Sequence, residues 1–197
     1  ISSLFFLWQA EGRVSEVVEE YREYVVEVPD GAKSKITFPD GSIVWLNAGS
    51  KVKYDSNFAK ASRKVELTGE GYFEVKPDAN APFYVETSDM SVKVLGTHFD
   101  VRNYEQKNIS ETVLLSGKVE VMMKNSGEKR ILSPNEKLSF DKRANNFTVD
   151  RVDAAEYALW TAEKLVEKRL KKFLTNVNEY DNLNKLFQTA KTKNLDN

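Results

Sequence analysis

The fold is organised around Arg63–Val75, RKVELTGEGYFEV, which we call the organising stretch. Val65 and Leu67 alternate with polar residues, which is the period-two pattern of a half-buried strand. Gly69 and Gly71 follow, where glycine permits backbone angles that a side chain would forbid. An aromatic run with high β propensity completes the stretch. The pattern therefore predicts a strand, a tight corner and a second strand.

Turn signals separate short β-rich segments throughout residues 25–152. Asp40-Gly41 joins the alternating segments Lys35–Pro39 and Ser42–Leu46, and this arrangement predicts a β-hairpin. Leu115-Ser116-Gly117 repeats the Leu67-Thr68-Gly69 pattern, which indicates successive hairpins or coils of one β domain. Further strands are expected at Tyr24–Pro29, Val52–Tyr54, Phe83–Glu86, Val92–Leu95, Phe99–Tyr104, Glu111–Leu115, Lys118–Met123, Arg130–Leu132, Leu138–Phe140 and Phe147–Val152. Short strands at this spacing predict a mainly antiparallel β-sandwich or roll.

The two ends of the chain differ from this β region. Residues 1–24 are expected to form a membrane-proximal segment or linker. They open with the apolar run Ile1–Trp8, which is too short to span a bilayer alone because a span needs ~20 apolar residues. The run is either a buried strand or docking segment, or the trailing end of a membrane helix. Asp153 resembles a helix N-cap, and apolar residues then recur every three or four positions, which predicts an α-helical segment over residues 153–197.

Composition excludes several kinds of chemistry. The chain has no cysteine, so a disulfide framework, a thiolate zinc site and a cysteine nucleophile are excluded. Its 29 basic and 30 acidic residues leave a net charge of −1, which provides no overall field for nucleic-acid binding. The one histidine, His98, lacks neighbours at metal-ligand spacing, and a structural role is expected for it. No catalytic residue, metal or cofactor is expected.

Two other functional hypotheses remain open from the residues. An enzyme would need Glu66, Glu70 or His98 to converge in a cleft, whereas solvated strand charges are the commoner outcome for acidic residues at this spacing. A secreted carbohydrate-binding module would need Trp45 or Tyr72 exposed in a row with other aromatic rings. Most aromatic residues stand at alternating strand positions, which favours core packing for Trp45, Tyr54, Phe58, Tyr72, Phe73, Phe83, Tyr84 and Phe99.

Several motifs resemble one family in content and order. Residues Phe38–Ser50, with Pro39-Asp40-Gly41-Ser42 followed by Val44 and Leu46-Asn47-Ala48, resemble the LPDGS-V-LNA-S signature of the FecR family. The likeness continues through the organising stretch and into later strands, at Tyr54, Phe58, Arg63, Val65, Leu67, Gly69-Glu70, Tyr72-Phe73, Val75, Pro82-Phe83, Val85, Thr87, Val92, Val94-Leu95-Gly96-Thr97, Phe99, Val101, Gly117, Val119, Val121, Leu132 and Pro134. This likeness to the FecR family is specific over residues 28–140.

The resemblance implies a regulatory role without catalysis. FecR-like proteins are single-pass inner-membrane anti-sigma factors or sigma regulators. Their cytoplasmic part holds an extracytoplasmic-function sigma factor, and their periplasmic β domain receives a signal from the N-terminal signalling domain of a TonB-dependent outer-membrane transporter. The imported ligand is an iron chelate or a glycan. The motif sequences are similar to those of the Bacteroidetes branch of the family. The resemblance thus implies a periplasmic chain, tethered by a helix that ends near Trp8.

The resemblance also implies a small α+β domain, of the STN type, after the β domain. The opening of that domain is matched at Trp160, Leu165, Val166, Leu170, Lys171, Phe173, Leu174, Tyr180 and Asp181. The Phe and Pro expected between Val166 and Leu170 are missing, as is about half of the domain, so an incomplete STN-like part is expected. The signature glycines meet turn and packing requirements, and no partner-binding residue is transferred from the family.

Overall fold

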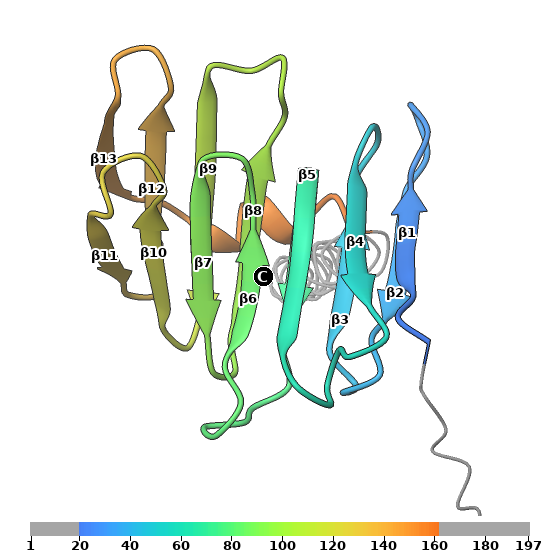
Figure 1. Ribbon diagram of the computed structural model, residues 1–197. Helices are drawn as coiled ribbons and strands as arrows, with labels where there is room; N and C mark the ends of the chain where they lie inside the picture. The colour runs from blue at the N-terminus through green and yellow to red at the C-terminus, as the bar shows by residue number, and fades with distance from the viewer. Residues whose placement is uncertain (1–19, 162–197) are drawn as a thin grey trace, which may run out of the picture.

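The computed structural model describes residues 20–161, which form thirteen strands and one short 3-10 helix (Figure 1). The elements in chain order are β1 (Glu23–Glu27), β2 (Ser34–Thr37), β3 (Ile43–Leu46), β4 (Lys51–Asp55), β5 (Arg63–Glu74), β6 (Phe83–Glu86), β7 (Met90–Val94), β8 (His98–Asn103), β9 (Ile109–Ser116), β10 (Val119–Met123), β11 (Lys129–Leu132), β12 (Glu136–Asp141), β13 (Asn146–Arg151) and η1 (Ala154–Ala158).

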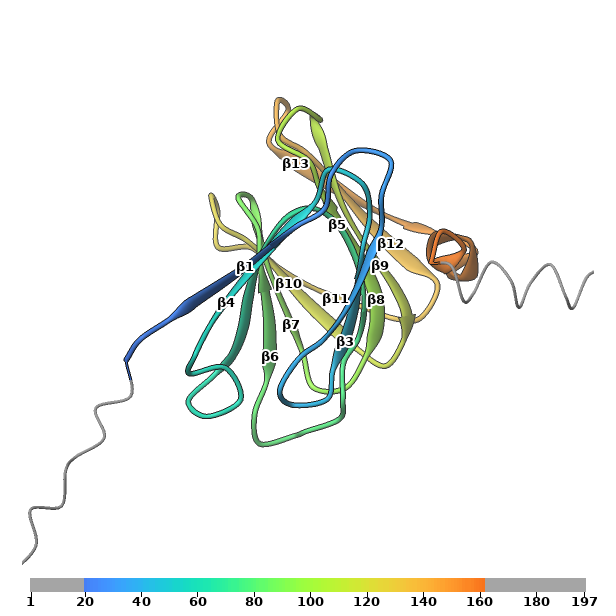
Figure 2. The same ribbon diagram turned by 90° about the vertical axis from the view of Figure 1, so that its right-hand side faces the viewer.

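All thirteen strands belong to one sheet that curls around a central core, as the view along the strands shows (Figure 2). The sheet has two walls that share β5. The first wall runs β1-β4-β5-β6-β7-β10-β11, and the second wall runs β2-β3-β5-β8-β9-β12-β13. Every pair is antiparallel except β5 with β6, which is parallel. The sheet is therefore a half barrel in which β5 is the common strand.

The organising stretch is one continuous strand of 12 residues, not two strands and a corner. The first half of β5 pairs with β4 and β6, and the second half pairs with β3 and β8. Gly69 lies at the change of wall with a φ of 98°, a backbone angle that L side chains rarely adopt. The glycines thus bend the strand between two walls, and the alternation of inward and outward side chains continues through the bend.

The Asp-Gly signal is confirmed as a hairpin, because β2 and β3 pair antiparallel from Thr37 opposite Ile43. The turn is longer than two residues. The Phe38 N–H donates to the Ser42 carbonyl (2.8 Å) and the Gly41 N–H donates to the Phe38 carbonyl (2.9 Å), so Pro39, Asp40 and Gly41 form the loop.

The structure corrects the predicted fold class in two respects. The region is mainly β as expected, but its strands form a single curled sheet and not a two-sheet sandwich. The α-helical segment predicted from Asp153 onward is not seen in the described residues. Asp153 is an N-cap, as expected, but the helix that it caps is the 3-10 helix η1. The turns of η1 close through bonds between residues three apart, such as Leu159 N–H to the Glu156 carbonyl (3.2 Å). Residues 1–19 and 162–197, with the predicted membrane-proximal run and the STN-like part, lie outside the described residues.

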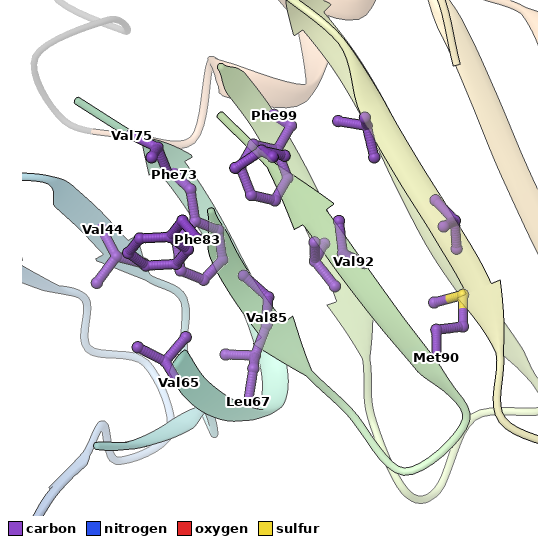
Figure 3. Close-up of a cluster of buried hydrophobic side chains, with 14 of the residues drawn as sticks. Val44, Val65, Leu67, Phe73, Val75, Phe83, Val85, Met90, Val92 and Phe99 are labelled. Carbon is purple, nitrogen blue, oxygen red and sulfur yellow. The ribbon is translucent and has the colours of Figure 1, made fainter. Parts of the chain in front are cut away.

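The core lies between the two walls and is built from the inward residues of nearly every strand (Figure 3). Phe73 stacks on Phe99 with ring centroids 5.2 Å apart, and Phe83 meets Phe73 edge-on. Core packing is thus confirmed for the expected aromatics Phe58, Phe73, Phe83 and Phe99. Within residues 20–161, no helix has the length and apolar character that crossing a membrane requires.

Candidate functional site

The signature residues hold loops in place. Arg63, which is 4% exposed, donates to Asp40 Oδ2 (3.2 Å) and to the carbonyl oxygens of Lys76 (2.9 Å) and Ala81 (2.6 Å). Asp40 also accepts from the Ser42 backbone N–H (2.8 Å) and hydroxyl (2.7 Å). This clamp ties the β2–β3 turn to the β5–β6 connection. The Arg63 and Asp40 side chains are buried and bonded to each other, so this part of the motif serves the fold.

A second part of the signature positions Glu70. The Ser50 hydroxyl accepts from the Glu70 backbone N–H (2.8 Å), and the Asn47 side-chain amide donates to Glu70 Oε2 (2.8 Å). The other carboxylate oxygen, Glu70 Oε1, accepts from Arg102 at 2.8 Å. Glu70 is therefore fixed on the outer face of the second wall, with its charge balanced by a neighbouring strand.

The outer face of the second wall carries a row of residues that are opposite one another across the strands: Lys35, Trp45, Tyr72, Asp100, Val113 and Lys137. Although these residues point away from the core, Tyr72 and Asp100 are buried, and Trp45 is 7% exposed. The covering segment, Ala154–Thr161, lies over them (Figure 2). Ala158 and Trp160 pack against Trp45 and Tyr72, whose ring centroids are 5.6 Å apart.

Asp100 is the unusual group beneath the covering segment. Its side chain is 1% exposed, and Oδ1 has no hydrogen-bond partner among the described residues. Burial raises the pKa of the Asp100 carboxyl well above its ordinary value, and the nearby Glu70 charge adds to the rise. Arg102 and the Trp160 indole favour the ionised form and limit the rise in pKa. The covering segment thus rests on a carboxyl group that folding holds toward its neutral form.

An ion-pair network borders this row. Arg102 lies between Glu70 (2.8 Å) and Glu111 (3.1 Å), and Lys137 reaches the second oxygen of Glu111 at 3.1 Å. Two carboxylates and two cations alternate across β5, β8, β9 and β12, so their charges balance. The network links four strands of the second wall, and it reaches the covering segment at Lys137, whose Nζ lies 6.0 Å from the centre of the Tyr157 ring.

The candidate residues for chemistry do not converge. Glu66 is exposed on the first wall, whereas Glu70 and Glu74 lie on the second wall, because β5 changes walls between Glu66 and Glu70. His98 is exposed at the start of β8, opposite Glu74. Residues 20–161 contain no group of three or more His, Asp or Glu side chains arranged to hold a metal ion. Sequence reasoning did not single out Asp100, Arg102 or Glu111. Strand alternation marks them as outward, but nothing local indicates the cover.

Comparison with known proteins identifies the relatives of this chain. The profile of the FecR protein family matches residues 24–120. Two crystal structures of candidate anti-sigma factors from Parabacteroides distasonis ATCC 8503 share 33% and 34% sequence identity with it, at TM-scores of 0.67 and 0.66. The chain belongs to the FecR family. The alignments with the two structures cover 71% and 70% of this chain, and the chain spans 64% of the length of each. No curated protein matches the sequence.

The FecR match divides the candidate site. It includes Trp45, Tyr72 and Asp100, and it ends at residue 120, before Lys137 and Trp160. The covered face therefore belongs to the FecR-matched part of the chain, whereas the covering segment comes from residues beyond it. The expected family membership is confirmed by this comparison.

Asp100 should give the stability of this FecR-family domain a distinctive dependence on pH. A raised pKa means that the folded state binds the proton more tightly, so this contribution is largest below the unfolded pKa of about 3.9 and is lost as pH rises through the raised value. In Asp100→Asn the contribution disappears. Urea unfolding between about pH 4 and pH 8 should show a smaller loss of stability in the variant than in the wild type.

The difference in stability between the wild type and Asp100→Asn, measured across pH, isolates the contribution of the Asp100 carboxyl group. Asp89 has a lowered pKa because Ser110, Asn103 and Lys142 hydrogen-bond to it, and its contribution to stability has the opposite sign. Because Asp89 is present in both proteins, it cancels in the difference. Identical pH curves for wild type and Asp100→Asn would contradict the assignment.

Proposed function

We propose that the described residues are the signal-receiving β domain of a FecR-like anti-sigma factor. The observation that carries the proposal is the combined match to the FecR family and to two candidate anti-sigma factors of the same fold. In this role the domain binds another protein and passes on a change of state. It performs no reaction on a substrate.

The partners follow from the family resemblance. The upstream partner is the N-terminal signalling domain of a TonB-dependent outer-membrane transporter, which imports an iron chelate or a glycan. The downstream partner is an extracytoplasmic-function sigma factor, held by a cytoplasmic part of the protein outside this sequence. The β domain then lies in the periplasm and is tethered to the inner membrane by an N-terminal helix.

The geometry supports a device with two states more than a rigid receptor. A ligand shifts a conformational equilibrium only when it binds one state more tightly than the other. The covering segment rests on a buried carboxyl group and a balanced ion-pair network, and Lys33 Nζ donates to its Trp160 carbonyl at 2.6 Å. In this proposal, a contact that moves the covering segment away from the second wall exposes Asp100 and Tyr72.

The carbohydrate-binding alternative is not favoured by the geometry. It requires Trp45 or Tyr72 to be exposed in a row of rings, but the covering segment leaves Trp45 7% and Tyr72 0% exposed. Phe38, Phe58 and Phe83 are buried in the core. These five aromatic residues thus serve packing, and the regulatory role is the better account.

Calorimetric titration tests the proposal directly. The purified 197-residue chain should bind the signalling domain of the TonB-dependent transporter encoded beside its gene, with Kd on the order of micromolar, as is usual for transient signalling contacts. The signalling domain of an unrelated transporter from the same genome serves as the control. Absence of heat with the neighbouring transporter's domain at about a hundred times that concentration would overturn the proposal.

A further inference from the structure

The strand β11 is a free edge of the first wall. Among the described residues only β10 pairs with it, and Figure 1 shows it at the end of the curled sheet. The Met123 N–H donates to the Glu128 carbonyl at 2.9 Å, which fixes the alternation of bonded and non-bonded pairs along the hairpin. Arg130 and Leu132 then bond to β10, whereas the backbone N–H and C=O groups of Lys129 and Ile131 point to the open side.

A hollow of about 390 Å³ lies on the outer face of the first wall beside this edge. It is lined by Leu95 and Gly96 of the β7–β8 turn, Lys118 of the β9–β10 turn, and Lys93, Glu120 and Ile131, which stand opposite one another on β7, β10 and β11. Its two large apolar side chains are exposed, Leu95 by 45% and Ile131 by 59%. Exposed apolar side chains that line a hollow mark a contact surface more often than scattered ones do.

The charges around the hollow select the partner. Glu120 already pairs with Lys129 at 3.2 Å. Lys93 and Lys118 form no ion pair with another described residue, although Lys93 Nζ lies 6.0 Å from the centre of the Tyr84 ring. The rim therefore carries two cations that are not neutralised, and a segment with carboxylates fits it better than a basic or neutral one.

The other free edges lack this combination. On β1, Glu23 and Glu27 are paired with Lys53 and Lys51, and the small hollow beside Glu23 is lined mainly by charged groups. On β13, Val149 is 40% exposed, and neither the hollow beside Glu23 nor the hollow beside Leu95 is lined by a β13 residue. Within residues 20–161, β11 combines an open backbone edge with an apolar hollow and lysines that form no ion pair, and neither β1 nor β13 does.

We propose that β11 receives an extended acidic strand of a partner protein by strand addition. The strand bonds to the backbone of Lys129 and Ile131, places one large apolar side chain in the hollow beside Leu95, and directs carboxylates to Lys93 and Lys118. This inference rests on the proposed function, which makes the partner the transporter's signalling domain.

The test is the titration described above, repeated with surface variants of the 197-residue chain. Ile131→Glu adds a charge at the hollow and should raise Kd at least about tenfold, the size of effect that a central interface residue has. Lys93→Glu together with Lys118→Glu should raise Kd by a similar factor. The control is Val149→Glu, which likewise places an acidic side chain at an exposed apolar position of an edge strand, β13, and should leave Kd within about twofold.

Each outcome separates the two proposals. If the wild type binds and both sets of β11 variants bind equally well, the docking surface is wrong and the proposed function stands. If the wild type does not bind, the proposed function fails and the docking surface fails with it. Circular dichroism and thermal unfolding check each variant, and if Ile131→Glu does not fold, the double lysine variant decides, because both lysines lie outside the core.

Discussion

Replacing Gly69 with alanine should lower the free energy of unfolding of this domain by about 3–5 kcal/mol. Gly69 has a φ of 98°, and a Cβ built there would lie 2.6 Å from the Ser50 Cα and 2.7 Å from its Cβ. The added Cβ would also meet the Ser50 hydroxyl oxygen, and because the Ser50 backbone Cα is among the clashing atoms, rotation of the Ser50 side chain alone cannot relieve the clash. Ser50 also accepts the Glu70 N–H, so a shift of Ser50 disturbs both walls at the bend of β5. Urea unfolding followed by circular dichroism measures the loss.

Gly31 offers a matched control for the backbone effect alone. It also has a positive φ, 79°, but a Cβ there would meet no atom within 4 Å. Gly31→Ala should therefore cost only the conformational penalty of about 1–2 kcal/mol. Equal losses in the two variants would show that close contact at Ser50 does not matter and would refute the account of the bend.

Replacing Arg63 with methionine should destabilise the domain by about 3–5 kcal/mol. The change leaves the buried Asp40 carboxylate without its cation and removes the donors to the carbonyls of Lys76 and Ala81. Removing one member of a buried pair is costly because the remaining charge stays desolvated. The urea midpoint should fall accordingly, while the unfolding slope stays close to that of the wild type.

Two further variants distinguish the clamp from a general effect of losing an arginine. Arg130 is exposed and pairs with the exposed Glu128 at 2.6 Å, so Arg130→Met should cost at most about 1 kcal/mol. In the double variant Arg63→Met with Asp40→Ala, the loss should be smaller than the sum of the two single losses, because the groups belong to one network. Strict additivity would argue against the clamp.

Local signals sufficed for much of the fold. The alternation of Val65 and Leu67, the Asp40-Gly41 turn and the regular spacing of short β-rich segments predicted a mainly β region with the correct hairpin between β2 and β3. These features depend on residues that are close in the chain. The corner predicted at Gly69 was wrong, because a positive φ is equally compatible with a turn and with a bend inside a continuous strand.

The candidate site was less accessible to sequence reasoning. Alternation places Trp45, Tyr72 and Asp100 at strand positions, but it does not say which face of the strand is covered. Their burial comes from Ala158 and Trp160, which follow the last strand. The ion pair of Glu70 with Arg102 joins residues 32 positions apart, and no local pattern predicts that partnership.

Local sequence patterns were enough to predict most of the strands and turns and the membership of the FecR family, because periodicity, glycine positions and motif order are properties of short stretches. The tertiary structure alone decided that β5 serves two walls, that Arg63 clamps two loops and that an outward carboxyl group is buried. The reason is physical. Backbone preference acts between neighbours in the chain, whereas burial, charge pairing and pKa depend on which distant segments meet in space.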